Sequence, residues 1–403
     1  MTVKTLRLQN FRNYGLQIVE FSDNLNIIYG ENAQGKTNIL EAVFLCSTGR
    51  SHRTQKDAEM IKFGEDAAVV GLEAERKNFG SFSIEIEIQR SGRKSILVNG
   101  TPQRRAGDLL GRLNCAVFSP EDLAVIKDEP QLRRRFLDMF ISQIRPAYYF
   151  NLQRYLGALR QRNALLRQAR ENPRLLGSIG PWDLQLSEYG AKVMRERIYF
   201  IRQINNFAYK NHIRITGGRE ELTVEYEPSL KIGGELIALA MPEGGSEGGA
   251  EAGAEAGACE WMDEDAKQQA DEIIGDLFMR ALEQGAHIDA ARMSTQYGPH
   301  KDDIVCSVDG RNLRLFGSQG QQRTAALALK MAQVDVMAGE IGDIPVLLLD
   351  DVMSELDRGR RDNLSSNMKN AQTLITGTER YDSAGERPET AYFLVKNGQV
   401  SKD

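Results

Sequence analysis

The residues with the clearest chemistry form a glycine-bounded loop that ends in a lysine and a threonine. Residues 30–37 read GENAQGKT and match the pattern G-x-x-x-x-G-K-[ST], in which backbone N–H groups surround a triphosphate and the next helix points its positive end at it. In this pattern Lys36 reaches the β- and γ-phosphates. Thr37 places its hydroxyl on Mg²⁺, a small cation that prefers oxygen ligands. The sequence therefore predicts a site for a nucleoside triphosphate and Mg²⁺, the alternative being a chance glycine turn.

The residues on either side of this phosphate loop fit the strand and the helix that it requires. Residues 24–28 alternate polar with apolar and then run apolar, as a strand entering a buried sheet does. After the loop, Ile39, Leu40 and Val43 share one helical face, and Gly49 supplies a helix stop. This context favours the nucleotide site over a chance turn.

Two carboxylates follow an apolar run near the other end of the chain. Residues 344–349 read IPVLLL and lead into Asp350 and Asp351, the pattern of a buried parallel strand whose C-terminal end meets a ligand. Asp350 would hold Mg²⁺ through its water shell. Asp351 would orient and activate the attacking water, because phosphoryl transfer needs positioning and charge stabilisation more than covalent chemistry. The alternative is that both acids merely begin a loop.

A third polar group lies between these two motifs. Ser318 and Gln321 have the S-x-x-Q spacing of a capping box, and Gly320 lets the backbone approach another body closely. An anion brought from elsewhere would fit this helix N-terminus. Just before it, residues 304–308 and 312–316 are expected to form a hairpin about Asp309-Gly310.

Length and cysteine usage limit the class of protein. At 403 residues the chain exceeds the usual size of one core, so two domains are expected. Its four cysteines lie far apart without metal-ligand spacing, which favours buried free thiols in a reducing compartment and argues against zinc. Because no stretch resembles a secretion signal or a membrane span, we expect a cytoplasmic protein without membrane partners.

The formal net charge of −5 conceals two segments of opposite sign. Residues 131–170 carry nine arginines and one acid, a local charge of +8, whereas residues 243–272 carry ten acids and one lysine, a local charge of −9. Basic stripes favour nucleic-acid phosphates through counterion release. The candidates for DNA contact are Arg133, Arg134, Arg135, Arg160, Arg162 and Arg167. For each arginine the alternative is a solvated helix face or an internal ion pair.

The rest of the pattern describes an α/β protein with a helical insertion. Strands are expected at 3–8, 17–21, 67–72, 82–88 and 94–98, followed by helices from Pro130, over 150–170 and over 182–212. The Gly/Ala/Glu-rich stretch at 242–260 is expected to be disordered. A basic polar loop at 49–54 is either a solvated surface loop or a contact to nucleotide or nucleic acid. The predicted domains are 1–122, 123–295 and 296–403.

Several sequence blocks resemble known ATPases. The phosphate loop, GSQGQ at 317–321, LLLDD at 347–351 and SELD at 354–357 follow the order found in ATP-binding-cassette ATPases of the SMC type. A wider set of blocks resembles the RecF family of bacterial recombination mediators. These blocks are NFRNY, GENAQGKTNILEA, GRSHRT, FSPEDL, RRRFLD, RQRN, GPHKDD, SQGQQRT and LLLDDVMSELD. The likeness extends over almost the whole chain except the acidic insert.

The resemblance implies a fold and a role for each motif. The fold would be α/β, an ABC/SMC-type P-loop ATPase head formed by 1–122 and 296–403 with a helical lid subdomain inserted at 123–295. The implied nucleotide-binding residues are Gly30, Glu31, Asn32, Ala33, Gln34, Gly35, Lys36, Thr37 and Asn38 of Walker A, and Ser318, Gln319, Gly320 and Gln321 of the signature. Thr37 and Asp350 would hold the metal, Asp351 and Lys36 would be catalytic, and Ser354 and Asp357 would belong to the D-loop.

The resemblance also implies a function. ATP and Mg²⁺ would drive a homodimer in which the signature of one protomer closes on ATP held by the other, with slow, DNA-stimulated hydrolysis acting as a switch. The implied partners are duplex DNA, single-strand/double-strand junctions, RecR, RecO and RecA. Three residues depart from the expected pattern. Asp351 replaces the usual glutamate, and Asp128 replaces a turn glycine. Residues 376–378 contain no histidine where many cassette ATPases place one that senses the γ-phosphate, and Thr376 would serve instead.

Three other classes fit parts of the sequence. A transporter-associated cassette subunit would need a surface for coupling to membrane helices, and none is recognisable. A structural SMC-type protein would need a long coiled coil, whereas the helical segments are short and broken by Pro and Gly. A nucleotide-gated DNA binder without enzymatic activity would share every motif, and an Asp351→Asn variant distinguishes it, because ATP-induced dimers persist longer in that variant if Asp351 is catalytic.

Overall fold

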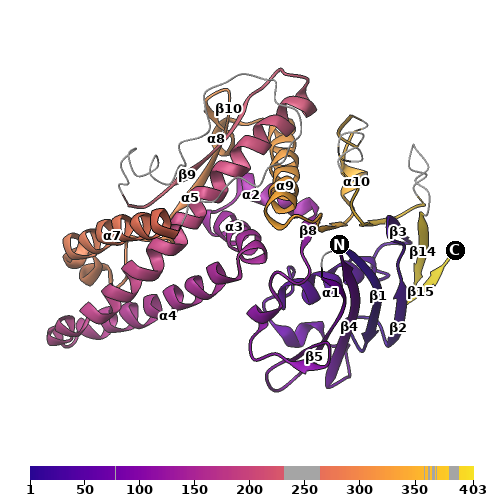
Figure 1. Cartoon of the computed structure of the whole chain (residues 1–403), viewed down its shortest axis with the longest axis horizontal. Helices are drawn as coiled ribbons and strands as arrows, with labels where there is room; N and C mark the ends of the chain where they lie inside the picture. Colours follow the sequence, from indigo (N-terminus) through magenta and orange to yellow (C-terminus); the bar gives the residue numbers. More distant parts are fainter. Residues whose placement is uncertain are drawn as a thin grey trace. The chain divides into compact units, whose positions relative to one another are not determined.

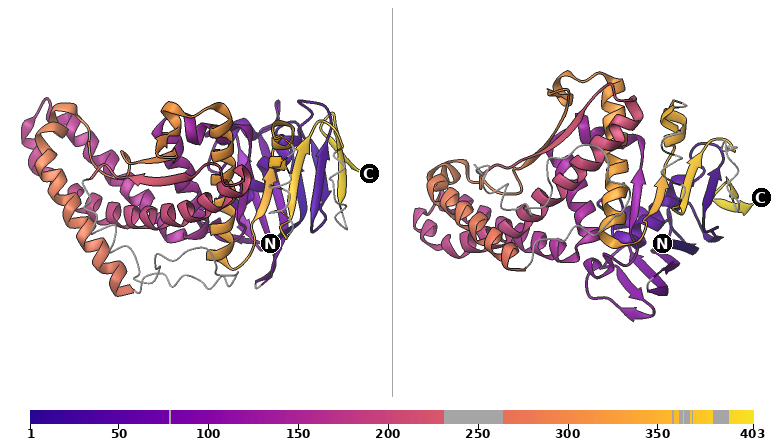
Figure 2. Two further views of the ribbon diagram at one scale, coloured as in Figure 1. Left: turned by 90° about the horizontal axis from the view of Figure 1, so that it is seen from above. Right: turned by 45° about the horizontal axis from the view of Figure 1, so that its top comes forward.

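The chain is described here by a computed structural model that covers residues 1–77, 79–230, 264–357, 359–361, 364, 368, 370–380 and 390–403. Its contacts divide the chain into two compact units. Unit 1 comprises Met1–Leu123, Arg214–Gly218 and Ala326–Asp403, and unit 2 comprises Ala124–Ile213 and Arg219–Ala325. Most strands belong to unit 1 and most of the long helices to unit 2, and Figures 1 and 2 show these elements coloured along the sequence. The stretch 242–260 lies outside the described residues.

The unit boundaries differ from the predicted domains at several positions, including Arg214–Gly218, which was expected in the helical insertion and is grouped with unit 1. The first segment of unit 1 ends at Leu123, one residue beyond the predicted 1–122. Residues 296–325, expected in the head, are grouped instead with unit 2. The reason is strand pairing, because β10 (Asp303–Val308) pairs with β9 (Leu222–Glu227) rather than with any strand of unit 1.

One sheet of unit 1 carries the strands that precede the phosphate loop and the two carboxylates. Its order is β15-β14-β3-β13-β12-β8, and all neighbours are parallel except the pair β14 and β15. The strands are β3 Leu25–Tyr29, β8 Cys115–Phe118, β12 Val346–Leu349, β13 Thr373–Gly377, β14 Ala391–Lys396 and β15 Gln399–Lys402. Because β3, β13 and β12 are adjacent and parallel, their C-terminal ends meet at one edge, where parallel sheets bind ligands.

The second sheet of unit 1 is antiparallel, with the order β2-β1-β4-β5-β6-β7. Its strands are β1 Thr2–Gln9, β2 Leu16–Glu20, β4 Ala67–Arg76, β5 Gly80–Gln89, β6 Ser95–Val98 and β7 Thr101–Pro102. Helix α1 (Lys36–Thr48) contacts strands β4 and β5 of this sheet and strands β8 and β13 of the parallel one. Contact on two sides explains why almost every residue of α1 is buried. The helix ends, as expected, at Gly49, whose φ of 68° is left-handed.

Unit 2 is built around long helices. They are α3 Pro130–Ile144, α4 Pro146–Ala169, α5 Gly180–Thr216, α7 Glu264–Arg292 and the start of α9 Gln319–Ile341. Helices α4 and α5 leave the connection at η4 (Pro173–Ser178) as the predicted helical pair, and α7 packs against them (Figure 1). Tyr155, Met194 and Phe278, one from each helix, lie in their shared core. The remaining short helices are η1 Asp57–Met60, η2 Ala106–Leu109, η3 Pro120–Leu123, α2 Ala124–Lys127 and α10 Val352–Glu355.

The expected hairpin at residues 304–316 is only half correct. The turn forms, with Asp309 and Gly310 both at positive φ. The returning strand is only β11 (Arg311–Asn312), however, and Leu313–Phe316 is the short helix α8. The side chain of Asn312 accepts hydrogen bonds from the backbone N–H groups of Arg314 and Leu315. This side-chain cap begins a helical turn where the returning strand of the hairpin was expected.

Among the described residues, no helix combines the length and the apolar character that a membrane crossing requires. Cys46, Cys115 and Cys306 are buried free thiols, as predicted, and the fourth cysteine, Cys259, lies outside the described residues. Burial raises the pKa of all three thiols.

Candidate nucleotide-binding site

The phosphate loop has a backbone that requires glycine at both ends. Gly30 has a φ of 147°, and a Cβ there would lie 2.3 Å from the carbonyl oxygen of Val395. Gly35 has a φ of 115°, and a Cβ there would lie 2.6 Å from the side-chain amide of Asn13. Both positions combine a left-handed conformation with close packing, which other residues do not tolerate. The glycines of the pattern are thus explained by neighbours far away in the sequence.

Lys36 lies across the loop that it follows. Its Nζ donates to the carbonyl oxygens of Gly30 at 2.7 Å and Glu31 at 2.9 Å, and the side chain is buried. This places the ammonium group inside the curve of the loop, where the pattern requires it to meet phosphate. Glu31, Asn32 and Ala33 are exposed at the tip of the loop.

The segment that reads NFRNY supports the phosphate loop from outside. The Asn13 side chain donates to the Gln34 carbonyl at 2.7 Å and accepts from the Asn38 amide at 2.8 Å. The Tyr14 hydroxyl donates to the Gly35 carbonyl at 3.0 Å, and burial raises the pKa of that phenol. The sequence did not single out these supporting residues as site residues, because no spacing along the chain connects them to the loop.

A buried carboxylate on α1 connects the same segment to the basic loop at 49–54. Glu41 accepts a two-pronged pair of hydrogen bonds from Arg12 at 2.6 and 2.9 Å, and one from the Ser51 hydroxyl. Arg53 lies 3.5 Å away and also donates to Asn38. Burial alone would raise the pKa of Glu41, but the bonds from Arg12 and Ser51 lower it below its usual value. At least Ser51 and Arg53 are therefore structural, and the loop is not simply solvated.

The two carboxylates meet the phosphate loop at the edge of the parallel sheet. The Thr37 hydroxyl donates to Asp350 Oδ1 at 2.8 Å, and the backbone N–H of Asp350 donates to the Phe118 carbonyl. Asp351 follows in a left-handed conformation with a φ of 51° and is the residue before α10, without a side-chain capping bond. The predicted metal pair Thr37 and Asp350 thus lies together, although 313 residues separate them in the chain.

The donor set fits Mg²⁺ bound together with a nucleotide. A hydroxyl and a carboxylate supply hard oxygen ligands, and Mg²⁺ is usually held by one or two such groups plus phosphates and waters. The described residues contain no cluster of three His, Cys, Asp or Glu side chains that could hold a metal by themselves. Thr37 and Asp350 would therefore hold the ion only as part of a complex with the triphosphate.

The predicted D-loop residues follow directly. The Ser354 hydroxyl donates to the Asp351 carbonyl at 2.7 Å. Asp357 accepts from the backbone N–H of Arg360 at 3.0 Å and forms an ion pair with the same residue at 2.9 Å. Both side chains are exposed, and these contacts hold their local backbone.

The signature residues 318–321 belong to unit 2 and form the predicted capping box. The Gln321 side chain accepts from the Ser318 N–H at 2.9 Å, and the Ser318 hydroxyl accepts from the Gln321 N–H at 3.2 Å. The Gln321 amide also donates to Glu220 at 3.0 Å. Gln319 and Gly320 form the exposed first turn of α9. The helix start is therefore held in place by side chains of its own unit.

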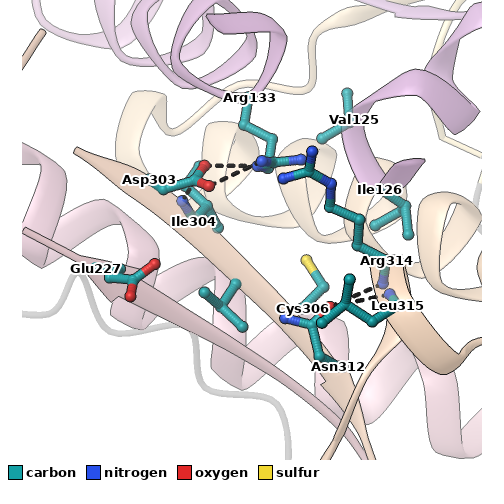
Figure 3. Close-up of a pocket in the computed structure, with 11 residues that line it drawn as sticks. Val125, Ile126, Arg133, Glu227, Asp303, Ile304, Cys306, Asn312, Arg314 and Leu315 are labelled. Atoms are coloured by element: carbon teal, nitrogen blue, oxygen red, sulfur yellow. Dashed lines mark hydrogen bonds and ion pairs between the residues drawn. The ribbon is translucent and has the colours of Figure 1, made fainter. Parts of the chain in front are cut away.

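The arginine candidates divide into buried and exposed residues. Arg133 forms a bidentate ion pair with Asp303 and lines a pocket of about 150 Å³, beside which the Arg314 side chain also lies (Figure 3). Arg162 is 1% exposed and pairs with Asp183 at 2.5 Å and Asp289 at 2.6 Å. The structure contradicts the assignment of Arg133 and Arg162 to DNA contact, since internal carboxylates already occupy both guanidinium groups.

The other four arginines differ in exposure. Arg134 is partly buried and donates to the Asp302 carbonyl at 2.6 Å. Arg135, Arg160 and Arg167 are exposed, and the last two lie on the same side of α4 because seven residues separate them.

The fold and the site together define an ATPase head of the SMC type. The family model for the RecF/RecN/SMC N-terminal domain matches residues 2–389. The Smc head domain of Pyrococcus furiosus has a TM-score of 0.53 at 14% identity, covering 100% of this chain and 95% of that one, which supports the fold alone.

Comparison with individual proteins narrows the family. The DNA replication and repair protein RecF of Acetivibrio thermocellus is 40% identical over 380 residues, 94% of each chain. That of Agathobacter rectalis is 39% identical over 402 residues, 99% of each. The solved structure of the recombination mediator protein RecF-ATP in the RecFOR pathway has a TM-score of 0.84 at 34% identity, covering 99% of this chain and 97% of that one. The chain belongs to the RecF family of SMC-type ATPases, as its motifs predicted.

Proposed function

We propose that this chain is an ATP-driven DNA clamp of recombination and repair. ATP with Mg²⁺ binds at residues 30–38 and at Asp350, and Asp351 activates the attacking water. Two protomers then join, with the signature residues of each on the nucleotide held by the other. Hydrolysis is slow, is stimulated by DNA and reopens the dimer. The observation that carries this proposal is the contact of Thr37 with Asp350 beside the buried ammonium of Lys36.

The proposed substrate is duplex DNA at gaps or at single-strand/double-strand junctions. The exposed arginines on α4 supply positive charge for its phosphates, whereas the acidic insert accounts for the negative net charge of the whole chain. Relatives are named DNA replication and repair proteins, and a related structure is described within the RecFOR pathway. On this basis the clamp would act in the cytoplasm with RecR and RecO and support the loading of RecA.

The test of this function is the mass of the protein in solution with and without ATP and a gapped duplex. The wild-type chain should be a monomer without ATP and a dimer with it. Ser318→Arg places a bulky side chain and a charge at the helix start that receives the nucleotide, so the dimer should be lost while ATP binding to the monomer remains. Arg93→Ala in unit 1 is the control and should dimerise normally. A wild-type chain that stays monomeric throughout would overturn the clamp, and a Ser318→Arg dimer would remove the signature from its interface.

A further inference from the structure

Thr376 lies at the point where the phosphate-loop strand and the carboxylate strand are joined. It is on β13, which lies between β3 and β12 in the parallel sheet. In the strand register Thr376 is opposite Ile28 of β3, while its neighbour Ile375 is opposite Leu349 of β12. Since Thr376 follows Ile375 and Asp350 follows Leu349, the Thr376 side chain lies beside Asp350.

The Thr376 hydroxyl bonds to both carboxylate residues at once. It accepts from the backbone N–H of Asp351 at 3.0 Å and donates to Asp350 Oδ1 at 2.8 Å. A hydroxyl has a single proton, and because the Asp351 N–H can only donate, that proton goes to an acceptor. Asp350 Oδ1 at 2.8 Å is the nearer acceptor, and the Leu349 carbonyl oxygen lies farther away at 3.4 Å. The side chain of Thr376 is fully buried.

These contacts argue against the role of a γ-phosphate sensor for Thr376. A sensor needs a donor that points at the nucleotide, whereas both acceptors in reach of this hydroxyl, Asp350 Oδ1 and the Leu349 carbonyl, belong to the protein itself. The same contacts show what the residue does instead. Thr37 and Thr376 both donate to Asp350 Oδ1, and none of the described hydrogen bonds ends on Oδ2. Oδ2 is thus the oxygen left to face a metal ion and its water shell.

The second contact fixes Asp351. Its φ of 51° is left-handed, an unfavourable conformation for a residue with a Cβ. The backbone N–H of Asp351 is held by Thr376, and its carbonyl oxygen accepts from Ser354. Because aspartate is one methylene shorter than the glutamate usual at this position, the reach of its carboxylate depends closely on the backbone. We infer that Thr376 is a positioning residue that orients both carboxylates for ATP hydrolysis. It holds the side chain of Asp350 and the backbone N–H of Asp351.

This inference rests on the proposed metal and catalytic roles of Asp350 and Asp351. The test compares Thr376→Val, which keeps the shape but removes the hydroxyl, with Thr376→Ser, which keeps the hydroxyl. Thr373→Val is the matched control, because Thr373 is also fully buried on β13, but its hydroxyl donates only to the Ala371 carbonyl at 3.2 Å. The affinity of each variant for a fluorescent ATP analogue is titrated with EDTA and with Mg²⁺. Hydrolysis and urea unfolding are measured in parallel.

For Thr376→Val we expect the ATP affinity in EDTA to equal that of the wild type. Adding Mg²⁺ should raise the affinity of the variant about tenfold less than it raises that of the wild type. This factor corresponds to the loss of one hydrogen bond to a charged group. The value of kcat should fall by at least the same factor, with a smaller change in KM. Thr376→Ser should restore the Mg²⁺ response to within about twofold, and Thr373→Val should lose stability without changing that response. An intact Mg²⁺ response and kcat in Thr376→Val would overturn the inference. A wild-type chain whose ATP affinity ignores Mg²⁺ would instead overturn the proposed metal site.

Discussion

At the scale of single residues, the most informative side chain outside the motif roles is Glu41. Its carboxylate is fully buried on α1, and Arg12, Ser51 and Arg53 surround it. Arg12 has a φ of 55°, so its backbone also adopts an unfavourable conformation to present the guanidinium. These contacts attach two loops, at 10–14 and 49–54, to the helix that begins at Lys36.

We predict that Arg12→Ala destabilises unit 1 by roughly 3 kcal/mol, because it leaves a buried carboxylate without its bidentate partner. Arg7→Ala is the control, since Arg7 is exposed and bonds only to its neighbour Gln9 at 3.1 Å, and we expect a change within about 0.5 kcal/mol. Native-state hydrogen exchange of the α1 amides reports the difference. Equal protection of these amides in both variants would show that the Arg12 pair does not stabilise the helix.

The residue scale also shows what the sequence could predict. Lys36, Thr37 and Asp350 could be proposed from the sequence because each lies in a short motif whose chemistry is local. Asn13 and Tyr14 were not assigned, since their partners lie about 20 residues away in the chain. Arg162 was misassigned because a count of arginines does not say which side of a helix is buried. It lies only two residues from the exposed Arg160, but on another face of α4.

At the scale of elements, the segment after α7 is attached to the helices of unit 2 through His300. Its Nε2 lies 3.0 Å from the Thr295 carbonyl, which can only accept, so Nε2 carries the proton and Nδ1 accepts from the Tyr155 hydroxyl at 2.6 Å. Burial lowers the pKa of His300 to about 4; the Thr295 carbonyl opposes this shift, and the nearby charges of Lys301, Arg134 and Arg197 add to it. The segment is therefore built around a neutral imidazole.

This pKa predicts a pH dependence for unit 2. The unfolded chain binds the proton below a pKa of about 6.5, whereas the folded chain does not until about pH 4. The unfolded state therefore binds more protons in this window, and the free energy of unfolding falls as the pH is lowered. Between pH 7 and pH 5 the loss from His300 should be roughly 2 kcal/mol.

His300→Gln isolates this contribution, because an amide can donate to Thr295 and accept from Tyr155 without titrating. Urea unfolding can be followed by tryptophan fluorescence, since Trp182, one of the two tryptophans of the chain, lies in unit 2. The variant should lose less stability than the wild type between pH 7 and pH 5. Parallel pH profiles for the two proteins would show that His300 is not the titrating group.

Element types were predicted better than the short connections between them. The strand and the helix around the phosphate loop formed as expected, because apolar periodicity over a buried element is a strong signal. The strand expected at 312–316 is wrong over four residues, since the side chain of Asn312 caps a helical turn there.

At the scale of the whole molecule, the question is which surface binds DNA. A net charge of −5 gives no answer, because the acidic insert and the basic stretch are separate segments. Exposure decides among the arginines instead. Arg160 and Arg167 are exposed on one side of α4, whereas Arg133 and Arg162 are engaged with carboxylates of their own unit.

We therefore predict that Arg160→Ala/Arg167→Ala reduces the slope of log affinity against log salt for duplex DNA by up to about 2, because each lost phosphate contact changes that slope by about 0.9. The matched control is Arg93→Ala/Arg104→Ala, which removes the same charge from exposed positions of unit 1. Affinity is measured in the presence of ATP over a range of salt concentrations. If net charge alone governed binding, both double variants would shift the slope equally. If α4 is the contact surface, only Arg160→Ala/Arg167→Ala changes the slope. A change of slope only in Arg93→Ala/Arg104→Ala would contradict the prediction and would indicate that DNA binds unit 1 instead.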